Sequence, residues 1–168
     1  VLKLGGCGFL SSTIDGEPLS VWKSRFQKLV RRADPHLRYV VERMVAAIVW
    51  RTYGQDGLEE MAKNTTVPVV NALSDDFHPC QLLADLLTIR EHKGSLAGLT
   101  VAFLGDGGSN MAQSYLLAGA NAGMHVRLGC PSEFSPAGHV VGDARAIAEK
   151  TGGSILVTTE PEQALAGA

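Results

Sequence analysis

Cysteine is scarce in this chain, and its three cysteines, Cys7, Cys80 and Cys130, stand far apart. None belongs to a Cys-x-x-C pair, so neither a disulfide framework nor a zinc site is indicated. The following histidines also lack the spacing of metal ligands: His36, His92, His125 and His139. No Ser–His–Asp set or pair of carboxylates stands out at these positions. We therefore expect no metal site.

The chain also lacks an apolar run near the roughly 20 residues that a membrane-spanning helix needs. Residues 1–6 have none of the ordered regions of a signal peptide, so we expect a cytoplasmic protein. The first residue is not Met, which fits a chain processed or cut from a longer one. Lys and Arg number 15 against 17 Asp and Glu, a formal net charge of −2. This balance gives no reason to expect nucleic acid or a membrane surface as a partner.

Glycine is abundant, at 19 of 168 residues, which fits tight turns between strands and helices. Nearly continuous Val, Ile and Leu predicts buried parallel strands, at residues 1–4 with 9–10, 45–50, 67–70, 100–104, 125–128 and 154–158. Helical spacing lies between them, at residues 56–63, 78–93, 110–122, 136–150 and 161–166. Gly94, Gly123 and Gly152 stand where these helices should end. The alternation predicts an α/β fold of right-handed βαβ units.

Residues 21–42 form an unusually basic stretch. Its apolar residues have roughly helical spacing until Asp34-Pro35 interrupts them. An amphipathic surface helix is the first interpretation. An insertion or sequence error, and a site for an acidic partner, remain open.

The motif Asp76-Phe77-His78-Pro79-Cys80-Gln81 precedes an apolar, helix-like run. A helix N-terminus has unpaired N–H groups and favours anions. His78 can donate to a carbonyl, and Gln81 has a donor and an acceptor for a carbamoyl-like amide. The motif therefore suits a small anionic ligand that carries an amide. The alternative is an ordinary capped helix with Pro79 in its first turn.

This motif closely resembles the His-Pro-Cys-Gln segment of ornithine carbamoyltransferases. The resemblance covers roughly residue 44 to the C-terminus, with a weaker match at residues 4–12. Its main motifs lie at residues 47–55, 67–73, 75–85 and 101–114. It implies two Rossmann-like halves joined by a bridging helix: a carbamoyl phosphate-binding domain at residues 1–77, the helix at 78–94, and an ornithine-binding domain at 95–168.

Arg51 follows a predicted strand, at the end where open α/β sheets bind ligands. Its guanidinium can bridge phosphate and carbonyl oxygens, although a solvated arginine would look the same. The resemblance implies that Arg51 and His78 are catalytic. It also implies that carbamoyl phosphate is bound by Arg51, His78, Pro79, Cys80 and Gln81. No metal or organic cofactor is implied.

The turn Gly105-Asp106-Gly107-Gly108-Ser109-Asn110 joins a predicted strand to a helix. A dinucleotide-binding fingerprint would need a third glycine where Asn110 stands, so an NAD-binding domain is a weak alternative. Glycines that simply permit a tight turn are another. The resemblance implies that Asn110 contacts ornithine, although Ser109 stands where the family has a second Asn.

The resemblance further implies a homotrimer with shared active sites. Thr13 aligns best with the family's Gln that reaches a neighbouring subunit, and it is too short to do the same. The family's Ser-Thr-Arg-Thr and His-Cys-Leu-Pro segments do not occur in this sequence. The implied function is carbamoyl transfer from carbamoyl phosphate to ornithine, giving citrulline and phosphate in arginine biosynthesis. We expect the 168 residues alone to be almost inactive. A catalytically dead binding or assembly module is the alternative.

Overall fold

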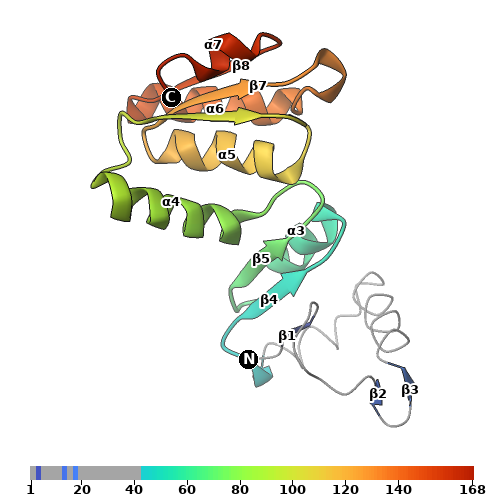
Figure 1. Cartoon of the computed structure of the whole chain (residues 1–168). Helices are drawn as coiled ribbons and strands as arrows, with labels where there is room; N and C mark the ends of the chain where they lie inside the picture. The colour runs from blue at the N-terminus through green and yellow to red at the C-terminus, as the bar shows by residue number, and fades with distance from the viewer. Residues whose placement is uncertain (1–2, 5–12, 15–16, 19–42) are drawn as a thin grey trace. The chain divides into compact units, whose positions relative to one another are not determined.

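A computed structural model describes residues 3–4, 13–14, 17–18 and 43–168. The chain divides into two compact units, Val1–Ser74 and Asp75–Ala168. The basic stretch at 21–42, Cys7 and His36 lie outside the described residues. Each unit contains a parallel sheet, and among the described residues one helix accompanies the first sheet and several flank the second (Figure 1), so the predicted α/β class is confirmed.

The first unit is built around a parallel sheet of order β1-β4-β5. Its strands are β1 (Lys3–Leu4), β4 (Ile48–Arg51) and β5 (Val69–Leu73). Two further strands, β2 (Thr13–Ile14) and β3 (Glu17–Pro18), pair antiparallel and depart from the all-parallel expectation. The sequence pattern predicted the start of β5 two residues early. Pro68 has no N–H to donate to a ladder, although its carbonyl accepts from the N–H of Ile48 at 2.8 Å.

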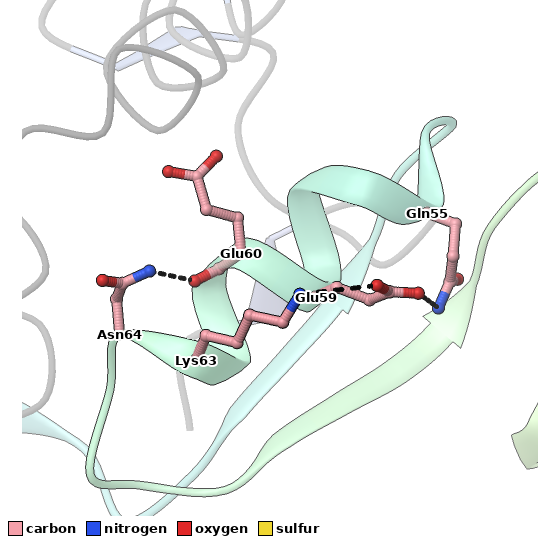
Figure 2. Close-up of polar contacts among 5 residues, drawn as sticks. All are labelled: Gln55, Glu59, Glu60, Lys63 and Asn64. Carbon is pink, nitrogen blue, oxygen red and sulfur yellow. Dashed lines mark hydrogen bonds and ion pairs between the residues drawn. The ribbon is translucent and has the colours of Figure 1, made fainter.

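Helix α3 (Gln55–Lys63) connects β4 to β5. Its buried side chains, Leu58 and Met61, form a small core with Ile48 and Trp50 of β4. Figure 2 shows the contacts on its exposed side. Lys63 Nζ lies 3.9 Å from a Glu59 carboxylate oxygen, and the amide of Asn64 donates to the carbonyl of Glu60 at 2.7 Å. Exposed pairs of this kind contribute only about 0.3–0.5 kcal/mol, so the buried side chains are what hold α3 to the sheet.

The second unit contains a parallel sheet of order β6-β7-β8. Its strands are β6 (Thr100–Leu104), β7 (His125–Gly129) and β8 (Ser154–Thr158). The register is regular, for instance Val101 opposite Val126 and Val126 opposite Ile155. Strands that are covered on both faces need this continuous apolar composition, which explains why the three strands were predicted nearly to the residue.

Helices cover both faces of this sheet (Figure 1). Helices α5 (Asn110–Asn121) and α6 (Gly138–Thr151) enclose the larger core, which includes Leu116, Val126 and Leu128. Helix α7 (Pro161–Leu165) lies over the other face, where a side chain added at Gly129 would meet Ala164. The 3-10 helix η1 (Ser132–Phe134) lies between β7 and α6. This arrangement brings the β6–α5 and β7–α6 loops to the carboxyl end of the strands.

Helix α4 (Pro79–Lys93) belongs to the second unit and packs against α5. It begins with Pro79 after the N-cap residue His78 and ends at Gly94, whose φ of 82° few other residues adopt. Its predicted start and stop are confirmed. Among the described residues, no helix is both long and apolar enough to cross a membrane.

Candidate functional site

The N-terminus of α4 is organised by His78. The Nδ1 atom of His78 accepts a hydrogen bond of 3.3 Å from the backbone N–H of Gln81. In a neutral imidazole, an accepting Nδ1 leaves the proton on Nε2. His78 can therefore cap the helix and still offer an N–H to a ligand carbonyl. The helix N-terminus adds partial positive charge beside it.

Gln81 and Asp85 lie one helical turn apart on α4. The Gln81 side-chain amide donates to Asp85 Oδ1 at 2.8 Å, and the hydroxyl of Tyr115 on α5 donates to Asp85 Oδ2 at 2.7 Å. Burial, followed by the hydrogen bond and the negative charge of Asp85, raises the pKa of Tyr115 to about 12. The other predicted ligand residues of this turn are Pro79, which is exposed, and Cys80, which is half-buried.

Ser114 connects this helix start to Asn110, the first residue of α5. Its hydroxyl accepts from the backbone N–H of His78 at 2.8 Å and donates to the backbone carbonyl of Asn110 at 2.6 Å. Ser114 is only 5% exposed, so this connection is shielded from water. Two segments that the sequence linked to different substrates are thereby joined through one side chain.

The glycine-rich turn between β6 and α5 has a clear structural role. Asp106 Oδ1 accepts from the N–H of Gly108 at 2.9 Å. The hydroxyl of Ser109 donates to the carbonyl of Asp106 at 2.7 Å and, as the N-cap of α5, accepts from the N–H of Ala112 at 3.3 Å. These short local bonds account for the Asp and Ser of this turn without a bound dinucleotide.

Gln113 joins three loops and was not singled out from the sequence. Its Nε2 atom donates to the carbonyls of Asp76 at 3.2 Å and Gly108 at 3.5 Å, and its Oε1 accepts from the N–H of Ala137 at 3.3 Å. The side chain is 5% exposed. The sequence signal for it is a long polar side chain on a helix rich in Ala and Leu, since such a side chain must find partners where it is buried.

Cys130 lies under the same turn, where it contacts Gly107. A side chain added at Gly107 would approach Cys130 Sγ to 2.8 Å and the carbonyl of Phe134 to 2.7 Å. Burial raises the pKa of the Cys130 thiol, and the Asp106 carboxylate adds to the increase against the hydrogen bonds from Ser135 and Gly107. The thiol is therefore a packing group here.

Arg51 lies in the first unit, as the exposed last residue of β4. The β4–β5 register shifts between Trp50 and Arg51, which ends the regular ladder at this point. Arg51 thus stands at the carboxyl end of a parallel strand, as predicted. His78, Gln81 and Asn110 lie in the second unit.

The loop after Arg51 is held by Gln55, a residue for which no sequence motif predicted a role. Its Oε1 accepts from Asn71 Nδ2 at 3.2 Å and from Ser74 Oγ at 2.8 Å. Ser74 is fully buried. These bonds tie the first turn of α3 to the end of β5 and so limit the freedom of residues 52–54.

The other residues discussed from the sequence are Thr13 and the histidines outside the His78 motif. Thr13 begins the two-residue strand β2. His92 and His139 are exposed, and His125 Nδ1 lies 2.9 Å from the hydroxyl of Ser154. Within residues 43–168 and the short described strands, no three His, Cys, Asp or Glu side chains gather as a metal site would require.

Two family models match the chain consecutively. Residues 30–91 match the aspartate/ornithine carbamoyltransferase carbamoyl-P binding domain, and residues 97–168 match the aspartate/ornithine carbamoyltransferase Asp/Orn binding domain. Together the two matches take in most of the 168 residues.

Curated relatives and solved structures agree with the family models. The chain is 62% identical over 155 residues to ornithine carbamoyltransferase of Clavibacter michiganensis, covering 92% of this chain and 50% of that protein. The corresponding protein of Renibacterium salmoninarum is 59% identical, with 94% and 50% covered. The chain therefore spans about half the length of these relatives.

Among solved structures, ornithine carbamoyltransferase from Pyrococcus furiosus superposes with a TM-score of 0.74 at 40% identity, covering 78% of this chain and 42% of that one. The enzyme from Gloeobacter violaceus gives a TM-score of 0.73 at 43% identity, covering 77% and 45%. These matches do not favour the NAD-binding alternative. The chain belongs to the aspartate/ornithine carbamoyltransferase family.

Proposed function

We propose that this chain supplies substrate-binding residues of an ornithine carbamoyltransferase, which transfers the carbamoyl group of carbamoyl phosphate to ornithine and releases citrulline and phosphate. The observation that carries the proposal is the Ser114 hydroxyl, which bonds both the His78 N–H and the Asn110 carbonyl. The segment proposed for carbamoyl phosphate and the residue proposed for ornithine are thus held together within the second unit.

In this proposal, carbamoyl phosphate binds at the N-terminus of α4. The partial positive charge of the helix N-terminus favours its phosphate, and the guanidinium of Arg51 can bind phosphate and carbonyl oxygens together. The Nε2–H of His78 donates to the carbamoyl carbonyl and stabilises the charge that grows there as the amine attacks. Gln81 completes the contact at the carbamoyl amino group. Pro79 and Cys80 shape the turn that carries these groups.

Ornithine is proposed to bind beside Asn110. The Asn110 side chain can donate to a carboxylate and accept from an amine. Its backbone is fixed through Ser114 to the start of α4, which suits the close approach of amine and carbonyl that carbamoyl transfer requires.

The larger organisation is proposed on the same basis. Residues 1–77 form the carbamoyl phosphate-binding domain, residues 78–94 the connecting helix, and residues 95–168 part of the ornithine-binding domain. The first compact unit ends at Ser74, before α4, and the Asp/Orn family match begins at residue 97, after it, which supports a connecting helix between the two domains. A homotrimer, a cytoplasmic location and a place in arginine biosynthesis belong to the same proposal.

The binding part of this proposal can be tested with the chain itself. Inorganic phosphate and phosphonoacetamide, a stable analogue of carbamoyl phosphate, are titrated into the chain and followed by NMR. We expect weak binding that Arg51→Ala reduces at least tenfold, because a charge-assisted bond contributes about 1.5–3 kcal/mol. Arg145→Ala, which removes an exposed arginine of α6, is the matched control. Equal binding by the wild type and Arg51→Ala would refute the assignment of Arg51.

The catalytic part needs the remaining segments of the site. We expect little or no citrulline from the chain alone. A chimera that carries this chain in place of the matching segment of the Clavibacter michiganensis enzyme should form citrulline. Arg51→Ala or His78→Ala in the chimera should reduce kcat/KM by about 10²-fold or more. A chimera that folds and yields no citrulline would contradict the proposed function.

A further inference from the structure

The carboxylate of Asp85 accepts two hydrogen bonds from different helices. Gln81 Nε2 on α4 donates to Oδ1 at 2.8 Å, and Tyr115 on α5 donates its hydroxyl to Oδ2 at 2.7 Å. An exposed Gln–Asp pair on one helix would exchange freely with water. Here the second bond fixes the carboxylate from outside α4.

Tyr115 is itself anchored in the second unit. Its ring packs against that of Phe103 on β6, with centroids 5.9 Å apart and planes inclined by 45°. The raised pKa, about 12, keeps its hydroxyl protonated and donating throughout the neutral range. The Asp85 carboxylate is therefore held by the Tyr115 hydroxyl, which stays protonated at neutral pH and whose ring is fixed by Phe103.

The hydrogen bond to Asp85 determines the orientation of the Gln81 side-chain amide. A carboxylate only accepts hydrogen bonds, so the NH2 end of Gln81 must face Asp85. The carbonyl oxygen Oε1 is the opposite end of the amide. An oxygen at that end attracts an N–H of a ligand, has no partner in a methyl group, and repels a carboxylate oxygen.

We propose that Asp85, held by Tyr115, is a positioning residue that orients Gln81 to select a carbamoyl amino group over a methyl group or an oxygen in the same place. This inference rests on the proposed function and deepens it. Neither Asp85 nor Tyr115 needs to touch the substrate, since both act through the Gln81 amide.

The selection can be measured with two phosphonates that differ at one group. Phosphonoacetamide carries an NH2 group where acetonylphosphonate carries a methyl group, and neither transfers a carbamoyl or acyl group. NMR titration of the full chain gives both dissociation constants and reports on the Gln81 side-chain NH2 signals directly. We expect the wild type to prefer the amide about tenfold, because a site built for an N–H rejects the analogue that lacks it.

Asp85→Asn is the informative variant. When its carbonyl accepts from Tyr115, the Asn side chain presents its NH2 to Gln81, so the Gln81 amide turns around. We expect the preference for phosphonoacetamide to fall to within about twofold, while acetonylphosphonate binding changes little. Tyr115→Phe keeps the ring on Phe103 and should give an intermediate preference. Glu91→Gln removes the same charge from an exposed position of α4 and should leave the preference unchanged.

Gln81→Ala tests whether Asp85 acts on ligand preference through the Gln81 amide. Adding Asp85→Asn to Gln81→Ala should change the preference no further, because the two residues act as a unit. If the wild type prefers the amide and Asp85→Asn retains that preference, or weakens both ligands equally, the positioning role is wrong and the proposed function stands. If the wild type binds neither phosphonate, the positioning role and the binding part of the proposed function are both overturned, and the chimera still tests the catalytic part. Should Asp85→Asn fail to fold, Tyr115→Phe and Gln81→Ala decide the same question.

Discussion

The backbone N–H of His78 donates a 2.8 Å hydrogen bond to the hydroxyl of Ser114, a residue 36 positions later in the chain. The same hydroxyl donates to the carbonyl of Asn110. One buried serine therefore sets the start of α4 against the first turn of α5. No local sequence pattern predicts this bond.

Ser114→Ala should lower the free energy of unfolding by about 1–3 kcal/mol, because it leaves the His78 N–H without its acceptor in a shielded position. Urea denaturation measures the change. Ser132→Ala removes a hydroxyl from an exposed loop and should stay within about 0.5 kcal/mol of the wild type. Equal stabilities of the two variants would contradict the role given to Ser114.

Gln113→Leu should destabilise the second unit by about 2 kcal/mol or more, because the carbonyl of Asp76 and the N–H of Ala137 lose their partner. Hydrogen exchange should show faster exchange at the Ala137 amide in particular. Gln113→Glu keeps the acceptor and loses the donors, and its charge would face two carbonyls. Its destabilisation should therefore diminish as the pH falls and the new carboxyl is protonated.

Gly107→Ala should cost about 1–3 kcal/mol, because the new methyl would overlap the Phe134 carbonyl and Cys130 Sγ. Gly142→Ala is the matched change: it lies in α6, is exposed and has open space at its Cβ. It should stabilise the protein by about 0.5–1 kcal/mol through helix propensity. Thermal melts of both variants check the opposite signs.

Tyr115 should make stability fall at high pH. Its pKa is raised from 10.0 to about 12 in the folded chain, so the folded state retains the proton longer than the unfolded state. The contribution is therefore complete below pH 10 and is lost as the pH rises through about 12. Unfolding free energies measured across this range should decline more steeply for the wild type than for Tyr115→Phe. Parallel declines would show that Tyr115 titrates normally.

The sequence by itself determined the fold class and most of the elements. The β6, β7 and β8 strands were predictable because strands buried on both faces need unbroken apolar runs. The ends of α4 were predictable from Pro79 and Gly94, whose backbone constraints act locally. The motif at His78–Gln81 also indicated its ligand chemistry, since cap geometry and side-chain type are local properties.

Only the tertiary structure decided which distant groups support that motif. Ser114, Gln113 and Tyr115 act across gaps of about thirty residues or more, to His78, Asp76 and Asp85. Each such bond depends on how α5 packs against α4 and the sheet. The spacing of residues along one helix does not predict that packing. The roles of these polar side chains follow from the rule that a buried donor must find an acceptor, but the identity of the acceptor is settled by the fold.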